Sequence, residues 1–190
     1  MCRRLMICVL FAISSVANAQ EDVPKPKVSD APLTSEQVAI YRAVLSTYYR
    51  VLNLANITEL LDRTDTECFK GLNLEAAQGT TAFIHRIGPE LMVDKIVLVD
   101  PDRQQGTIKE NDPEKLMRKV IDDHEQITDE QLDKSLKRAF SSGLFTLSEI
   151  AFDKEHRHAI VSYGFVCGAL CGHGNLLVLK KVGHKEPTLS

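Results

Sequence analysis

Two cysteines in a glycine-rich run near the end of the chain place the strongest constraint on its fold. The run reads CGALCGHG and extends from Cys167 to Gly174. If the flanking strands pair as a hairpin, Cys167 and Cys171 face each other across the turn, near the Cα separation of about 5.5 Å that a disulfide prefers. Gly168, Gly172 and Gly174 are expected to supply the positive φ values that so small a covalent loop needs. We therefore expect a disulfide between Cys167 and Cys171.

The first residues have the features of a cleavable export signal. A basic dipeptide is followed by an uncharged apolar stretch at residues 5–13, and residues 17–19 read Ala-Asn-Ala, a small-x-small cleavage pattern. The apolar stretch is shorter than the roughly 20 residues that span a bilayer. We expect residues 1–19 to be a signal peptide and the mature protein to be periplasmic or secreted. Both compartments are oxidising, which favours the expected disulfide.

Charge and length restrict the partners and the number of domains. Cleavage of the signal leaves 21 basic and 26 acidic residues, a formal charge of −5. A mildly acidic chain without a long basic run has no electrostatic footprint for nucleic acid, and no later segment is apolar for long enough to span a membrane. Residues 20–32 are rich in Pro, Lys, Asp and Ser and predict a flexible leader. Residues 33–190 then have the length of one domain.

Two segments carry the signature of a capped amphipathic helix. Thr34 with Gln37, and Thr128 with Gln131, each form a capping box. Apolar residues then recur every three or four positions, as on one face of a helix. These residues are Val38, Tyr41, Leu45, Tyr48 and Leu52 in the first segment, and Leu132, Leu136, Ala139 and Phe140 in the second. Gly143 ends the second helix.

The middle of the chain predicts shorter elements. We expect a helix at residues 74–86, a strand at 95–99 and a polar loop at 102–112. Another helix is expected to begin at Asp112 and Pro113. Its predicted buried side consists of Leu116, Met117, Val120 and Ile121. The pattern at residues 53–66 fits a strand or a helical turn equally well.

The chain after Gly143 changes to an extended pattern. Residues 144–152, 158–166 and 175–182 are rich in aliphatic and aromatic side chains and are separated by short polar or glycine-rich connections. Such connections favour consecutive antiparallel strands. The sequence therefore predicts an α+β domain in which N-terminal helices pack on a C-terminal antiparallel β-meander.

Two alternative chemistries would use the same cysteines. Cys167, Cys171 and His173 could bind zinc, for which Cys68 is the only plausible fourth ligand. Thiol exchange is the other alternative, but its motifs place two residues between the cysteines and a helix after them. Here three residues separate the cysteines in an expected sheet turn. We prefer the disulfide between Cys167 and Cys171, which leaves Cys68 unpaired, buried or bonded to another chain. Pairing of Cys68 with either of the two is the alternative, and we expect neither a metal nor a cofactor.

Histidines and acidic residues form two further groups. His156 and His158 alternate on a strand and His184 returns beside them; we interpret them as solvated residues at a turn. The second group is an acidic cluster that consists of Asp122, Asp123, His124, Glu125, Asp129 and Glu130. We interpret it as an acidic helix end and cap, since no pattern indicates burial that would shift a pKa for acid/base catalysis. No nucleophile elbow, phosphate loop, dinucleotide fingerprint or zinc-protease motif occurs, so no catalytic residue is identified.

The C-terminal region resembles a family of uncharacterised secreted or periplasmic bacterial proteins. The residues from Ser142 to Lys181 read SGLFTLSEIAFDKEHRHAIVSYGFVCGALCGHGNLLVLKK. In that family a serine-led strand ending in Phe-Asp or Phe-Asn precedes an Ala-Val-rich strand, a CGxLCGxG turn and a strand ending in basic residues. The resemblance implies a fold and export, and no activity. This chain departs from the family after Lys181, where Gly and then Trp are common.

These observations favour a non-enzymatic exported domain that binds an unknown partner or associates with the cell envelope. The alternative is a small hydrolase or metal-dependent enzyme whose site is assembled only in three dimensions, from His, Asp or Cys of several elements. A third hypothesis is a ligand carrier of the cystatin-like or NTF2-like kind, with a long first helix on a curved sheet. The decisive observation is whether a polar cavity lies between the first helix and the sheet.

Overall fold

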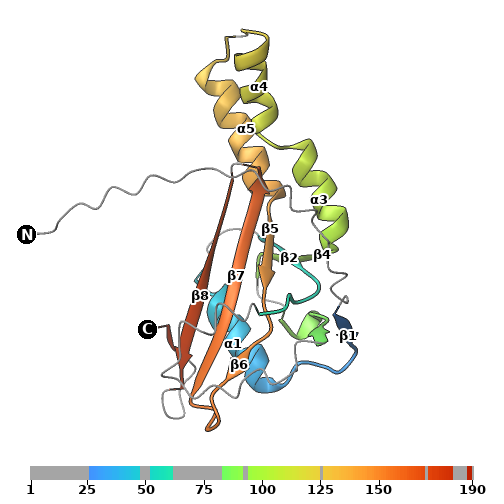
Figure 1. The fold of residues 1–190 in the computed structure, drawn as a ribbon, viewed down its shortest axis with the longest axis vertical. Helices are drawn as coiled ribbons and strands as arrows, with labels where there is room; N and C mark the ends of the chain where they lie inside the picture. Colours follow the sequence, from blue (N-terminus) through green and yellow to red (C-terminus); the bar gives the residue numbers. More distant parts are fainter. Residues whose placement is uncertain are drawn as a thin grey trace, which may run out of the picture.

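The computed structural model describes residues 26–47, 52–61, 83–91, 94–124, 126–169, 171–181 and 188–189. The expected signal peptide, Cys68 and His184 lie outside these ranges. Figure 1 shows a sheet of long and short strands, with helix α1 against it and a group of helices at one end. Helices and strands together make an α+β fold, as predicted.

The main sheet is mixed. Its strands lie in the order β4-β2-β5-β7-β8-β9, and β6 pairs with the start of β7. Their bounds are β2 Leu52–Ala55, β4 Ile96–Val99, β5 Leu144–Leu147, β6 Ala151–Phe152, β7 His158–Gly168, β8 Cys171–Lys180 and β9 Thr188–Leu189. Strands β5, β7 and β8 are antiparallel as expected, but β2 runs parallel to both β4 and β5. The prediction of a simple antiparallel meander is therefore wrong for the part of the sheet that contains β2 and β4, where the pairing is parallel.

The helices are not confined to the N-terminal part of the chain. Three of them, α3 (Pro101–Glu110), α4 (Glu114–Asp122) and α5 (Asp129–Ser142), lie between β4 and β5. Parallel strands need a long crossover connection rather than a tight turn. The helices α3 to α5 form the connection that brings the chain from β4 to β5, on the other side of β2.

Helix α1 (Ser35–Leu45) follows directly from its local sequence. Thr34 Oγ1 accepts a 3.2 Å hydrogen bond from the Gln37 backbone N–H, and the Thr34 N–H donates a 2.8 Å bond to Gln37 Oε1, so both halves of the predicted capping box are present. One face of α1 is buried in the main core with Phe145, Leu147 and Val161 of the sheet. That face consists of Ile40, Tyr41, Val44 and Leu45. The helix is shorter than predicted: Leu52 begins strand β2, because its backbone pairs with Ile96 of β4, and Tyr48 lies outside the described residues.

Two short strands form a separate sheet. Strand β1 (Lys27–Ser29) is parallel to β3 (Phe83–His85). Strand β1 falls within the expected flexible leader and is held there by its pairing with β3. Strand β3 falls within the helix expected at residues 74–86, and this prediction is wrong for residues 83–86, because their backbone pairs with the segment after β2. Residues 74–82 lie outside the described ranges.

Helix α3 occupies most of the segment at residues 102–112 for which the sequence predicts a polar loop, so that prediction is wrong. Asp100 Oδ1 caps it by accepting a 2.9 Å hydrogen bond from the Arg103 N–H, and Pro101 stands at its first position. Ile108 is its one buried residue, so the sequence has no apolar stripe there to indicate a helix. The strand predicted at residues 95–99 is confirmed as β4, and a short 3-10 helix, η2 (Pro89–Leu91), precedes it.

Helices α4 and α5 form a helical hairpin that extends beyond the ends of the strands (Figure 1). Helix α5 has the predicted capping box and is followed by Gly143. Helix α4 begins after Pro113 as predicted, but none of its residues is buried. Met117 is 41% exposed and Ile121 is 67% exposed. The predicted buried side of α4 is therefore wrong, because the apolar pattern identifies a face of the helix without showing whether anything covers it.

Candidate functional site

The cysteine run lies at the turn of the β7–β8 hairpin. Cys167 is near the end of β7 and Cys171 begins β8, with their Cα atoms 5.0 Å apart and their sulfur atoms at disulfide distance. Gly168 has a φ of 149°, a conformation that residues with a Cβ rarely adopt. The two predicted partners are therefore neighbours across a tight turn that requires glycine at position 168. The positive φ values predicted for Gly172 and Gly174 are wrong, because both residues are part of strand β8.

Asp112 joins this turn to helix α4. Its Oδ2 accepts a 2.9 Å hydrogen bond from the Ala169 N–H in the turn, and its Oδ1 accepts a 3.0 Å bond from the Glu114 N–H at the start of α4. A Cβ added to Gly168 would lie 2.6 Å from Asp112 Oδ1. The cysteine turn is therefore packed closely against the start of the helical hairpin.

His173 lies beside two aromatic rings. Its ring centroid lies 5.6 Å from that of Phe165 and 6.0 Å from that of Tyr163. Over the residues that the structure describes, no three His, Cys, Asp or Glu side chains are placed to hold a metal ion, and Cys68 lies outside them. Cys171 begins a strand, whereas the second cysteine of a thiol-exchange motif lies in a helix. The structure thus offers no support for the zinc or the thiol-exchange hypothesis.

Asp153 organises the turn between β6 and β7. Its Oδ1 accepts hydrogen bonds from the backbone N–H groups of Arg157 (2.6 Å) and His158 (2.9 Å), and its Oδ2 lies 2.7 Å from His158 Nδ1. Burial acts to raise the pKa of Asp153, but the hydrogen bonds from His158 and Arg157 outweigh it and hold this pKa below its ordinary value. Because Nδ1 of His158 is engaged by the carboxylate, Nε2 is the ring nitrogen left for a ligand.

His156 and Lys181 converge on Glu36 of helix α1. His156 Nδ1 lies 3.2 Å from Glu36 Oε2, and Lys181 Nζ donates a 3.1 Å hydrogen bond to Glu36 Oε1. The His156 ring also stacks on Phe152, with 4.7 Å between the ring centroids. Partial burial acts to raise the pKa of Glu36, but the contacts with Lys181 and His156 bring it below its ordinary value. These contacts tie the first turn of α1 to the sheet.

A cavity of about 400 Å³ opens beside these contacts, between α1 and the sheet. Its apolar lining consists of Ala39, Ile40, Phe152, Ala159 and Leu179, and its polar lining of Ser35, Glu36, His156, Arg157, His158 and Lys181. His156 and His158 do lie at a turn, as expected, but the His158 side chain is only 25% exposed. The interpretation of both histidines as merely solvated residues is therefore incomplete, because they also line a cavity.

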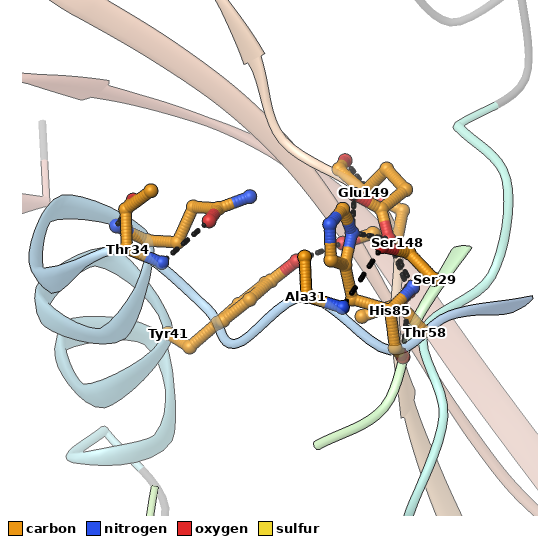
Figure 2. Close-up of polar contacts among 9 residues, drawn as sticks. Ser29, Ala31, Thr34, Tyr41, Thr58, His85, Ser148 and Glu149 are labelled. Atoms are coloured by element: carbon orange, nitrogen blue, oxygen red, sulfur yellow. Dashed lines mark hydrogen bonds and ion pairs between the residues drawn. The ribbon is translucent and has the colours of Figure 1, made fainter. Parts of the chain in front are cut away.

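A second polar cluster joins Thr58, His85 and Glu149. His85 Nδ1 lies 3.0 Å from both carboxylate oxygens of Glu149, and the His85 backbone N–H donates a 2.8 Å hydrogen bond to Oε1. The hydroxyl of Thr58, a buried residue, donates to the same oxygen. Figure 2 shows these side chains together beside Ser148, with Tyr41 reaching them from α1.

This cluster holds separate chain segments together. Thr58 bonds to the Glu149 carboxylate and to the His85 backbone, so its hydroxyl makes no nucleophile–base contact with the imidazole. Sequence reasoning missed the cluster because His85 fell in an expected helix and its partners are 27 and 64 positions away. We assign it a structural role.

The acidic group at residues 122–130 lies where α4 ends and α5 begins. Asp122 is the last residue of α4, and Asp129 and Glu130 form the first turn of α5. Asp122, Asp123 and His124 are exposed. The interpretation as an acidic helix end and cap is confirmed for these residues.

The described part of the chain contains no helix that is both long and apolar enough to cross a bilayer. No protein-family model, curated protein or solved structure matches the chain. The cavity between α1 and the sheet is therefore interpreted from its own geometry.

Proposed function

We propose that this protein is a non-enzymatic exported binding domain, and that the cavity between α1 and the sheet holds a small amphipathic anion. The observation that carries the proposal is the composition of this cavity, an apolar lining with a polar, mainly cationic edge. Small-ligand sites in proteins commonly combine such a lining with a few polar groups that orient the ligand.

The charges at the edge favour an anion. Arg157 and Lys181 are cationic, whereas Glu36 is the one carboxylate among the described residues that line the cavity. That carboxylate is engaged by Lys181 and His156. Within the part of the chain that the structure describes, the guanidinium of Arg157 has one ion-pair contact, 3.7 Å from Glu155, and the side chain is well exposed. It can therefore turn toward a ligand carboxylate, sulfonate or phosphate.

The apolar lining of the cavity favours a ligand that also has an apolar group. Ile40 and Leu179 are almost fully buried, and Ala159 is 5% exposed. An apolar group that reaches these side chains leaves water at little cost in lost hydrogen bonds. A volume of about 400 Å³ suits a ligand with one ring system or a short alkyl chain.

The sequence supports export of this domain. Residues 1–19 have the pattern of a cleavable signal, and residues 142–181 resemble secreted or periplasmic bacterial proteins. In such a compartment we expect the disulfide between Cys167 and Cys171 to be closed. The protein would then act as a periplasmic or secreted carrier or sensor of its ligand, or in association with the envelope.

A hydrolytic role is the less favoured alternative. The cavity gathers histidines from the β6–β7 turn and a carboxylate from α1, which an enzyme could use. However, Nδ1 of each histidine faces a carboxylate, and within the described residues neither imidazole makes a hydrogen bond to a hydroxyl or thiol. A binding site needs no such contact.

The experiment uses two fluorescent probes, the anionic anilinonaphthalene sulfonate and the neutral Nile red. Wild-type protein is expected to bind both. The Ala39→Trp variant, which fills the cavity, should lose both probes, and Arg157→Gln should weaken only the anionic probe. Arg103→Gln on α3 removes an exposed arginine that lies outside both the cavity and the α4–α5 hairpin, and should change neither. Equal binding of the anionic probe by wild type, Ala39→Trp and Arg157→Gln would contradict the proposal.

A further inference from the structure

The α4–α5 hairpin presents an apolar surface that the described chain leaves uncovered. Met117, Ile121, Leu136 and Phe140 are each between 37% and 67% exposed. Between the two helices and the β7–β8 turn lies a groove of about 400 Å³, lined mainly by apolar side chains. They include Met117, Leu132, Leu136, Phe140 and Phe165. Contiguous exposed apolar surface of this kind marks an interaction site more often than a lone exposed residue does.

The charges of this hairpin are separated along its length. Its distal end, residues 120–133, contains six acidic residues and no lysine or arginine. Its base, residues 112–119 and 134–142, contains six lysines and arginines and two acidic residues. The six basic side chains of the base are all exposed. Two of them have a partner within the same helix, Arg118 with Glu114 and Lys137 with Asp133.

The stability of α4 itself does not account for this arrangement. Asp122 and Asp123 stand at its C-terminal end, where the helix dipole favours cations over anions. The acidic first turn of α5 lies next in the chain, and like charges gathered at one end repel each other. A cationic surface that docks against the distal end would offset both the unfavourable interaction of Asp122 and Asp123 with the helix dipole and the repulsion among the acidic residues.

We propose that the occupant of this surface is the same hairpin of a second copy of the chain, docked antiparallel. A two-fold axis between the hairpins places each acidic distal end against the basic base of the other copy. The four helices then pack as a bundle around the apolar side chains. Ile121, the most exposed of them, enters the partner's groove beside Met117 and Phe140.

The lengths of the two helices allow the hairpins of two copies to lie side by side. Helix α4 has 9 residues and α5 has 14, so at about 1.5 Å per residue they are roughly 14 and 21 Å long.

The proposed dimer surface is far from the ligand cavity. The β7–β8 turn at the base of the groove is about 30 Å along β7 from that cavity, at roughly 3.3 Å per residue. The dimer surface and the ligand cavity can therefore be tested separately.

Sedimentation equilibrium of the chain recovered from cells expressing the whole sequence tests the apolar part of the proposal. The wild type should have twice the mass of one chain, and Ile121→Asp should have the mass of one chain. Val97→Asp changes an exposed apolar residue of β4 outside the hairpin and should remain dimeric. Circular dichroism checks that each variant is folded. A monomeric wild type, or a dimer that survives Ile121→Asp, would overturn the proposal.

Charge reversal tests the antiparallel arrangement. A distal variant, Asp122→Lys with Asp123→Lys, and a base variant, Lys134→Glu with Arg138→Glu, should each dimerise more weakly than the wild type. Mixed together, they should form a heterodimer. One of its two contacts then places the introduced lysines of one copy against the introduced glutamates of the other, and the second contact joins two unaltered ends. A mixture that stays monomeric would overturn the antiparallel arrangement.

Discussion

The hydroxyl of Tyr41 donates a 2.9 Å hydrogen bond to the carbonyl oxygen of Ser148, which lies 107 positions later in the chain. Tyr41 is fully buried on α1, and burial, together with the negative charge of Glu149, raises the pKa of its hydroxyl well above the ordinary value. The hydroxyl therefore stays protonated and remains a donor. This bond anchors α1, the helix that contributes Ser35 and Ile40 to the cavity lining, to the chain after β5.

Replacing Tyr41 with Phe should lower the free energy of unfolding by about 1–3 kcal/mol, because the Ser148 carbonyl loses a buried donor. Denaturant unfolding measures the difference. Tyr41→Ala should cost more, about 3–5 kcal/mol, since it also leaves a void in the core. Unchanged stability of Tyr41→Phe would show that this hydrogen bond does not anchor α1.

Removal of the Asp153 charge should make stability depend less on pH. The pKa of Asp153 is depressed in the folded state, so its charge stabilises the fold at neutral pH. This contribution is lost as the pH falls below the ordinary pKa of an aspartate and through the depressed value. Asp153→Asn should therefore be less stable than the wild type at neutral pH, and the difference should vanish in acid. A difference that is constant with pH would contradict the assigned pKa direction.

Gly168 should not tolerate a side chain. Its φ of 149° and the proximity of Asp112 Oδ1 mean that Gly168→Ala should destabilise the protein by about 1–3 kcal/mol. Gly106, inside α3, has no atom within 4 Å of an added Cβ, and Gly106→Ala should instead stabilise by about 0.5–1 kcal/mol. Thermal unfolding of the two variants compares their stabilities directly. If both substitutions changed the stability in the same direction, this account of the turn would be contradicted.

The pairing of Cys167 with Cys171 should be visible in the mass of the intact protein. Alkylation of the denatured, unreduced protein should leave both cysteines unmodified, and reduction should add two labels, one at each position. Reduction should also lower the free energy of unfolding by about 2 kcal/mol, the effect of releasing so small a loop. Labels on both cysteines before reduction would mean that the oxidised turn is not the stable form.

Elements whose signals are local could be predicted from the sequence. Each capping box, at Thr34 and at Thr128, makes its two hydrogen bonds within a segment of four residues. Both helices begin where these boxes predict. The strands β7 and β8 could be predicted because they are long and a short turn joins them. Helix α3 was missed although Asp100 and Pro101 repeat the signal of Asp112 and Pro113, because its polar composition concealed it.

Features that depend on distant segments could not be predicted. The parallel pairing of β2 with β4 and β5 joins segments that no local pattern relates. The contact of His85 with Glu149 spans 64 positions, and that of His156 with Glu36 spans 120. The pattern of α4 indicated its apolar face correctly, but whether that face is covered depends on the rest of the fold. The cavity belongs to this class, since its lining comes from α1, the β6–β7 turn and β8.

The most direct measurement is the mapping of bound anilinonaphthalene sulfonate by the backbone amide shifts of the isotope-labelled protein. We predict that the shifted amides cluster around the cavity, at residues 35–40, 152–159 and 179–181, and that Ala39→Trp abolishes these shifts. Shifts confined to the α4–α5 groove, or no saturable shifts at all, would contradict the claim that the cavity is the ligand site.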